Sequence, residues 1–150
     1  MHDTIGKVLV SACLTGENCK YNGGNNYSRQ VEEFLKDREY IAVCPEMLGG
    51  LTIPRCPAEL VNGRAVDRNG NDVDEAFRKG AGKALETIQN EKIDLAILQP
   101  RSPSCGVRQI YDGTFTGRLI DGRGLFAELL VRQGIRVIDA DEIGSLPKKR

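Results

Sequence analysis

Residues 93–106 read "IDLAILQPRSPSCG": an apolar run, typical of a buried strand, is followed at once by a segment with two prolines and a cysteine that predicts a rigid turn. The stretches "KVLVSAC" (7–13), "YIAVCPE" (40–46) and "IRVIDAD" (135–141) repeat the apolar run. Short apolar runs of this kind are typical of parallel strands that are covered on both faces. The sequence therefore predicts a mainly parallel sheet of about four strands.

Helical patterns separate these strands. Residues 28–37 place Ser28 as an N-cap before an apolar face, and residues 123–134 end at Gly134, which suits the position just after a helix. Residues 72–92 also show helical spacing, although Gly80 and Gly82 weaken that pattern. Strands that alternate with helices indicate the α/β class, and we expect a Rossmann-like three-layer sandwich with long loops at the carboxyl edge of the sheet.

Length and charge define the class of protein further. With 150 residues, 40% of them hydrophobic, the chain has the size of a single domain over 1–150, with a basic tail at 147–150. The 21 basic and 21 acidic residues cancel, which disfavours extensive nucleic-acid binding. No apolar run approaches the roughly 20 residues of a membrane span, and no basic leader precedes an apolar stretch. We therefore expect a cytoplasmic protein without membrane contact.

Two polar segments, 14–27 and 45–71, are rich in Gly, Asn and Pro and interrupt the alternation. Long ordered loops in compact domains are usually functional. Residues 59–66, "ELVNGRAV", predict a hairpin around Asn-Gly, and residues 110–120 predict either a second hairpin or a loop that crosses the edge of the sheet. The "GGNN" at 23–26 is better explained as a tight turn than as an anion-binding loop.

Three of the five cysteines follow predicted strands. Cys13 and Cys44 end two of them, and Cys105 lies a few residues beyond a third, so all three belong to carboxyl strand ends, where open α/β sheets bind ligands. The competing interpretation is that they are small buried residues without a function. Cys19 is a candidate fourth ligand, a redox-active thiol or an accidental surface cysteine, and Cys56 has the weakest claim. The spacing alone identifies no metal, because the chain has no CxxC pair.

Four blocks resemble the signature motifs of the 2-thiouracil desulfurase family, in that family's order and within residues 7–139: "VSACLTGENCKYNGG", "CPEMLGGLTIPRCPAEL", "RSPSCG" and "IYDGTFTGRLIDGRG". The resemblance implies a desulfurase with a [4Fe-4S] cluster held by Cys13, Cys44 and Cys105. It further implies a fourth iron left open to take sulfur from a small thiolated nucleobase such as 2-thiouracil. The sequence leaves open whether the substrate is the free base, a nucleoside or thiolated RNA. The implied acid/base residues are Glu46 and Ser102.

The chemistry of desulfuration explains why a carboxylate and a hydroxyl would lie beside the cluster. Replacing C=S by C=O requires attack by water, transfer of a proton and departure of hydrosulfide, and a carboxylate beside the cluster is a suitable base. Glu46 is two residues from Cys44, and Pro100 and Pro103 stiffen the turn that presents Ser102. The competing interpretations are an exposed or helix-start acid for Glu46 and local turn bonding for Ser102 and Ser104.

The chain also departs from the family pattern. Gln99 stands where a lysine is common, Cys56 stands where proline is typical and is a candidate competing ligand, and milder changes occur at Thr15, Lys20 and Asn22. Four arginines are candidates for phosphate or base contacts, with solvated surface as the alternative: Arg55, Arg101, Arg108 and Arg118. His2 is the only histidine and lies at the terminus, so no His-dependent triad is expected.

Two other classes of protein remain as alternatives. One is a module that binds a nucleotide or carries sulfur without turnover. The other is a zinc-stabilised or structural-cysteine α/β domain.

Overall fold

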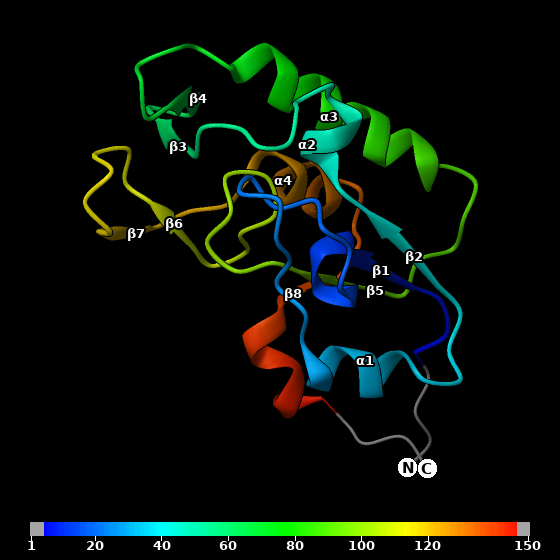
Figure 1. Ribbon diagram of the computed structural model, residues 1–150. Helices are drawn as coiled ribbons and strands as arrows, with labels where there is room; N and C mark the ends of the chain where they lie inside the picture. Colours follow the sequence, from blue (N-terminus) through cyan, green and yellow to red (C-terminus); the bar gives the residue numbers. More distant parts are fainter. Residues whose placement is uncertain (1–4, 147–150) are drawn as a thin grey trace.

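A computed structural model describes residues 5–146 and shows four parallel strands in one sheet, with helices on both faces (Figure 1). The sheet has the order β2-β1-β5-β8, formed by Tyr40–Val43, Val8–Ser11, Leu95–Leu98 and Val137–Asp139. Its strands lie within the four apolar runs, so the predicted α/β class and parallel sheet are confirmed. The predicted basic tail at 147–150, like His2, lies outside the described residues.

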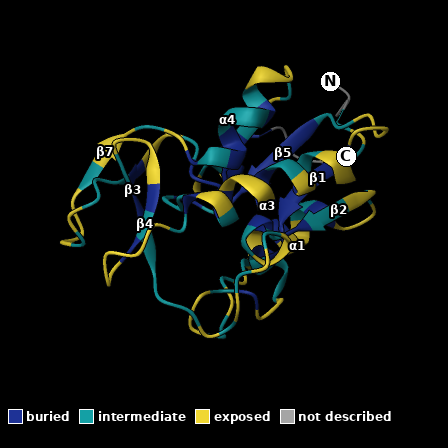
Figure 2. Ribbon diagram, turned by 90° about the horizontal axis from the view of Figure 1, so that it is seen from above, coloured by how far each residue is buried: buried dark blue, intermediate teal, exposed yellow. Residues whose placement is uncertain are grey.

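Helices cover the two faces of the sheet. On one face lie α1 (Arg29–Leu35) and the 3-10 helix η2 (Ala140–Ser145); on the other lie α3 (Asp74–Thr87) and α4 (Leu125–Arg132). Figure 2 shows the buried strands between helices whose outer surfaces are exposed. The Ser28 hydroxyl accepts a hydrogen bond from the Val31 amide at 3.2 Å, and Gly134 follows α4 with φ +78°, so both predicted helix ends are confirmed.

Alternating residues of the strands belong to two apolar clusters, one on each face of the sheet. Val8, Val10, Leu95 and Ile97 face α1 and η2, where they pack with residues that include Val31, Leu35 and Ile143. Leu9, Ala96 and Leu98 face α3 and α4, where they pack with residues that include Ala81, Ala84, Phe126 and Leu130. Burial on both faces explains why these strands show no polar alternation in the sequence.

Two hairpins lie side by side, away from the main sheet (Figures 1 and 2). Strands β3 (Ala58–Val61) and β4 (Arg64–Asp67) are joined at Asn62 and Gly63, both with positive φ, as a two-residue Asn-Gly turn requires. Strands β6 (Gln109–Tyr111) and β7 (Leu119–Asp121) pair antiparallel, so the hairpin interpretation of 110–120 is correct. A third apolar cluster of Leu60, Ala65, Phe77 and Ile110 ties the hairpins to α3.

Three short helical elements escaped the sequence analysis. The 3-10 helix η1 (Ala12–Thr15) follows β1, α2 (Pro45–Leu48) follows β2, and η2 follows β8. Segments of four to six residues contain too few turns for a helical period to be visible. None of the helices within residues 5–146 is long and apolar enough to cross a membrane.

Two glycines allow α2 and α3 to touch through their backbones. A Cβ atom on Gly80 of α3 would overlap the carbonyl oxygen of Pro45, and one on Gly49 would overlap the carbonyl oxygen of Ala76. By contrast, a Cβ on Gly82 would meet no atom within 4 Å. Glycine is therefore required at position 80, and the close contact that it permits fixes the position of α2 and of the residues on it.

Replacing these glycines by alanine separates packing from helix propensity. Gly80→Ala should lower the free energy of unfolding by about 2 kcal/mol, because the steric overlap exceeds the propensity gain. Gly82→Ala, the matched control, should raise it by roughly 0.5–1 kcal/mol. Urea unfolding of the reduced protein measures both changes. Equal stabilisation by the two variants would contradict the backbone contact.

Candidate active site

Three cysteines meet at the carboxyl edge of the sheet. Cys13 lies in η1 just after β1, Cys44 directly follows β2, and Cys105 lies in the turn after β5. The strands β2, β1 and β5 are neighbours, and the chain leaves β1 and β5 toward helices on opposite faces. This is the topological switch point at which such sheets form their ligand crevice. Here all three cysteines line one cavity of about 500 Å³.

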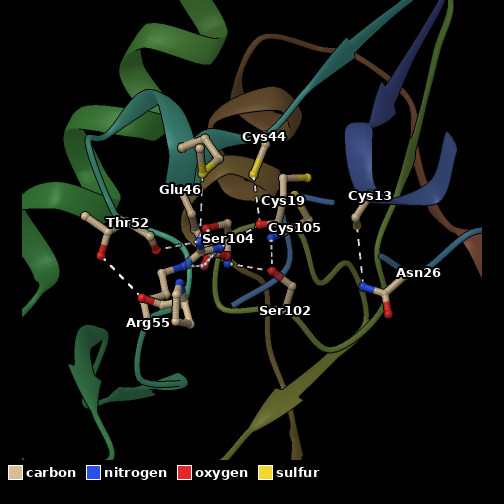
Figure 3. Close-up of polar contacts among 12 residues, drawn as sticks. Cys13, Cys19, Asn26, Cys44, Glu46, Thr52, Arg55, Ser102, Ser104 and Cys105 are labelled. Carbon is tan, nitrogen blue, oxygen red and sulfur yellow. Dashed lines mark hydrogen bonds and ion pairs between the residues drawn. The ribbon is translucent and has the colours of Figure 1, made fainter. Parts of the chain in front are cut away.

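Cys19 also lies in this cavity. Its loop, which follows η1, places it 92% buried among the other thiols, and Figure 3 shows the four cysteines around the same space. The Cys19 thiol hydrogen-bonds to the thiols of both Cys13 and Cys44. Of the three interpretations of Cys19, the accidental surface cysteine is therefore wrong. Cys56 is not among the described residues that line the cavity.

The four thiols differ in protonation. The hydrogen bond from Cys19 is the main cause that lowers the pKa of Cys44 to about 7, and the same donor lowers the pKa of Cys13. The pKa of Cys19 is raised, first by its bond to Cys13 and then by its bond to Cys44. Burial raises the pKa of Cys105. The single proton of the Cys19 thiol is thus shared between two thiols whose pKa values it lowers.

Glu46 lies on α2 in the same cavity wall and is held from two sides. Arg55 donates to its Oε1 atom from Nη2 at 3.0 Å and from Nε at 3.2 Å, and the Ser104 hydroxyl donates to Oε2 at 3.3 Å. The Arg55 side chain is only 9% exposed and also donates to the carbonyl oxygen of Cys19 at 3.0 Å. One buried guanidinium therefore links the carboxylate to the Cys19 loop (Figure 3).

The turn at 101–106 is held by hydrogen bonds to a side chain and to the start of α4. The Ser102 hydroxyl oxygen accepts hydrogen bonds from the amides of Ser104 at 3.1 Å and Cys105 at 3.0 Å. The carbonyl oxygens of Pro103 and Ser104 accept from the first amides of α4, those of Leu125 and Phe126. Helix α4 begins on this turn, so the turn both satisfies the helix terminus and holds Cys105 in place.

The structure places all five predicted site residues, Cys13, Cys44, Cys105, Glu46 and Ser102, in the wall of one cavity, where their roles stay predictions. The sequence analysis missed the contact of Ser104 with Glu46. Ser102 and Ser104 are both typical turn residues, and nothing in the local sequence shows which of them contacts a carboxylate distant along the chain. Arg55 was one of four candidate arginines, and the sequence does not distinguish it from the other three. It reaches Glu46 because the segment after α2 folds back over the cavity.

The remaining candidates fall into two groups. Arg101 and Gln99 line the cavity, and Arg101 also pairs with Asp141 at 3.4 Å. Outside the lining, Arg108 pairs with Asp139 at 3.2 Å, and Arg118 pairs with Asp112 at 3.8 Å. A tight turn lies at 20–23, closed by the Gly23 amide on the Lys20 carbonyl, so the turn predicted for the "GGNN" at 23–26 lies earlier in the chain.

The donor set suits a cluster better than a single ion. Within residues 5–146, no three His, Cys, Asp or Glu side chains are arranged to bind one metal ion. Three cysteines nevertheless share a cavity, and thiolates around a cubane lie farther apart than thiolates around one ion. The cysteines that line the cavity therefore fit an iron–sulfur cluster, and the set of three ligands stays a prediction.

Alkylation of the metal-free, reduced protein tests the role of Cys19. The rate of Cys44 labelling by iodoacetamide should rise with pH and reach half its maximum near pH 7, because a lowered pKa yields thiolate at lower pH. Cys19→Ala removes the donor and should move this midpoint toward the ordinary value of 9.0. Peptide mass spectrometry follows each site, with Cys56 as internal control. An unchanged midpoint would refute the hydrogen bond.

Comparison with known proteins agrees with this geometry. The family model described as 2-thiouracil desulfurase matches residues 8–142. The Bacillus subtilis (strain 168) protein YbbK is 38% identical over 149 residues, which cover 93% of this chain and 99% of YbbK. The solved structure of the [4Fe-4S]-dependent thiouracil desulfidase TudS aligns with a TM-score of 0.87 and 38% identity, over 94% of this chain and 95% of that one. The resemblance is confirmed, and the chain belongs to the 2-thiouracil desulfurase family.

Proposed function

We propose that this chain is a [4Fe-4S]-dependent desulfurase that converts the thiocarbonyl of a small thiolated nucleobase, 2-thiouracil or a relative, into a carbonyl. The observation that carries the proposal is the convergence of three cysteines from neighbouring strand ends on a cavity that also holds a fixed carboxylate. The similarity to TudS, a [4Fe-4S]-dependent thiouracil desulfidase, supports the same cofactor and substrate class. Five free cysteines suit a reducing compartment, and we propose the cytoplasm.

Cys13, Cys44 and Cys105 would hold the cluster. When bound through three thiolates, a cubane supplies one iron with an open position, a Lewis acid with affinity for soft sulfur. The lowered pKa values of Cys13 and Cys44 favour the thiolate forms that ligation needs. Cys105 gives up its proton on ligation, because a coordinated thiol is deprotonated outright.

The reaction is a hydrolysis without net change of oxidation state. Water adds its oxygen to the thiocarbonyl carbon, the C–S bond breaks, and C=S plus H₂O becomes C=O plus H₂S. Glu46 is the base that accepts a proton from water, and its carboxylate is presented in one orientation by Arg55 and Ser104. Ser102 lines the cavity and uses its oxygen as an acceptor for two amides, which leaves its hydroxyl proton for the substrate.

Single cysteine substitutions test the ligand set. Cys13→Ser, Cys44→Ser and Cys105→Ser should each lose iron and sulfide after anaerobic reconstitution, together with the broad absorbance of such clusters at about 400 nm. Cys56→Ser, which changes a cysteine outside the cavity wall, should reconstitute like the parent. Equal incorporation in all four variants would rule out the cluster assignment and favour the structural-cysteine alternative.

Glu46→Gln tests the base. The variant should retain iron but lose turnover by roughly 10²–10⁴-fold, because the amide cannot accept the proton. Uracil and sulfide formed from 2-thiouracil measure turnover, and iron content reports the integrity of the site. Loss of iron would show that Glu46 supports the cluster instead, and full activity would exclude it as the base. A reconstituted parent protein without turnover would favour the carrier alternative.

A further inference from the structure

The cavity extends beyond the cysteines to the two hairpins. A second part of its wall comes from β3, from the residue after β4 and from the β6–β7 hairpin: Glu59, Arg68, Tyr111 and Phe115. This part contains an acid, a base and two aromatic rings and no cysteine. The proposed chemistry at the sulfur atom uses none of these residues, so they are available to bind the rest of the substrate.

Glu59 is the most unusual of them. It is 91% buried, and its Oε1 atom accepts hydrogen bonds from the amides of Gly113 at 2.9 Å and Phe115 at 3.1 Å. Its Oε2 atom has no hydrogen-bond partner among residues 5–146. In the same part of the chain no fully buried side-chain oxygen or nitrogen lacks a partner, so Oε2 is not fully buried and keeps accessible surface. Because Glu59 lines the cavity, we infer that Oε2 opens into it.

The carboxylate is held firmly enough to select a ligand. Its two acceptor bonds anchor the loop between β6 and β7, where Phe115 has φ +58°, a conformation uncommon for a bulky residue. Gly113 packs so closely that a Cβ atom would lie 2.9 Å from the carbonyl oxygen of Leu60. The side chain of Glu59 thus fixes the loop with one oxygen and is itself oriented by that loop.

We propose that Glu59 determines substrate specificity: its Oε2 atom accepts a hydrogen bond from an N–H or O–H group of the thiolated base or nucleoside. The inference rests on the proposed function and extends it from the sulfur atom to the rest of the substrate. A carboxylate oxygen in a cavity wall favours a ligand that supplies a donor. It penalises a ligand that displaces water from the oxygen without replacing the lost hydrogen bond. The ring of Phe115, in the same wall, offers the heterocycle an apolar surface.

Glu59→Gln is the decisive variant. Its amide oxygen can still accept from Gly113 and Phe115, which preserves the loop, while its amide nitrogen turns the open acceptor into a donor. We expect uracil or uridine, measured by calorimetry with the reconstituted protein, to bind about 10-fold more weakly or worse. Glu86→Gln, an exposed substitution on α3, is the charge-matched control and should bind both ligands like the parent.

The two ligands identify the donor. Weakening of uracil alone assigns the ring N1–H, weakening of uridine alone assigns a sugar hydroxyl, and weakening of both assigns N3–H. In each case the effect should vanish with the matching methylated or deoxy analogue. Unchanged affinity for both uracil and uridine would overturn the proposal. The calorimetric assay measures binding and needs no turnover. A failure of the proposed desulfurase function would instead appear as a parent protein that forms no uracil and sulfide from 2-thiouracil.

Discussion

Parallel pairing of β1 with a strand on each side is the constraint on which the site depends. Val10 lies opposite Ala42 of β2 and Ile97 of β5, so the three strands end together at one edge. The residues that follow these ends are far apart along the chain and would have no reason to meet in another topology. Antiparallel placement of any one strand would carry its cysteine to the opposite edge of the sheet.

Backbone contacts then turn this approximate meeting into a defined geometry. The turn at 101–106 is locked between β5 and the first amides of α4, and α2 is pressed against α3 where only glycine fits. Cys105 and Glu46 therefore sit on segments whose positions are set by main-chain atoms rather than by flexible side chains. Preorganisation of this kind is what a reaction with several simultaneous requirements needs.

The sequence was sufficient for the parts of the protein that repeat a pattern. Apolar runs identified the four strands of the sheet, turn residues such as Asn62 and Gly63 identified a hairpin, and strand ends pointed to Cys13, Cys44 and Cys105. Contacts between distant segments left no such pattern. The hydrogen bond of Ser104 to Glu46, 58 positions away, and the bridge from Arg55 to the Cys19 loop depend on how loops fold over the sheet edge. Gly80 weakened the helix prediction, because helix propensity takes no account of the contact with the Pro45 carbonyl that requires a glycine there.

The hairpins have a consequence for how such enzymes diversify. They form separate two-stranded sheets, joined to the turn that carries Cys105 by a bridge between Ile110 and Arg101, and the loop 112–117 lies beyond this bridge. Substitutions in the loop 112–117 can therefore reshape one wall of the cavity while the sulfur-handling end keeps its geometry. The segment 55–59 limits that freedom. At one end Arg55 binds the carboxylate of Glu46, and at the other Glu59 accepts a hydrogen bond from the loop 112–117. A lineage that keeps its substrate is thus expected to tolerate change at the hairpin tips while this short stretch stays unaltered.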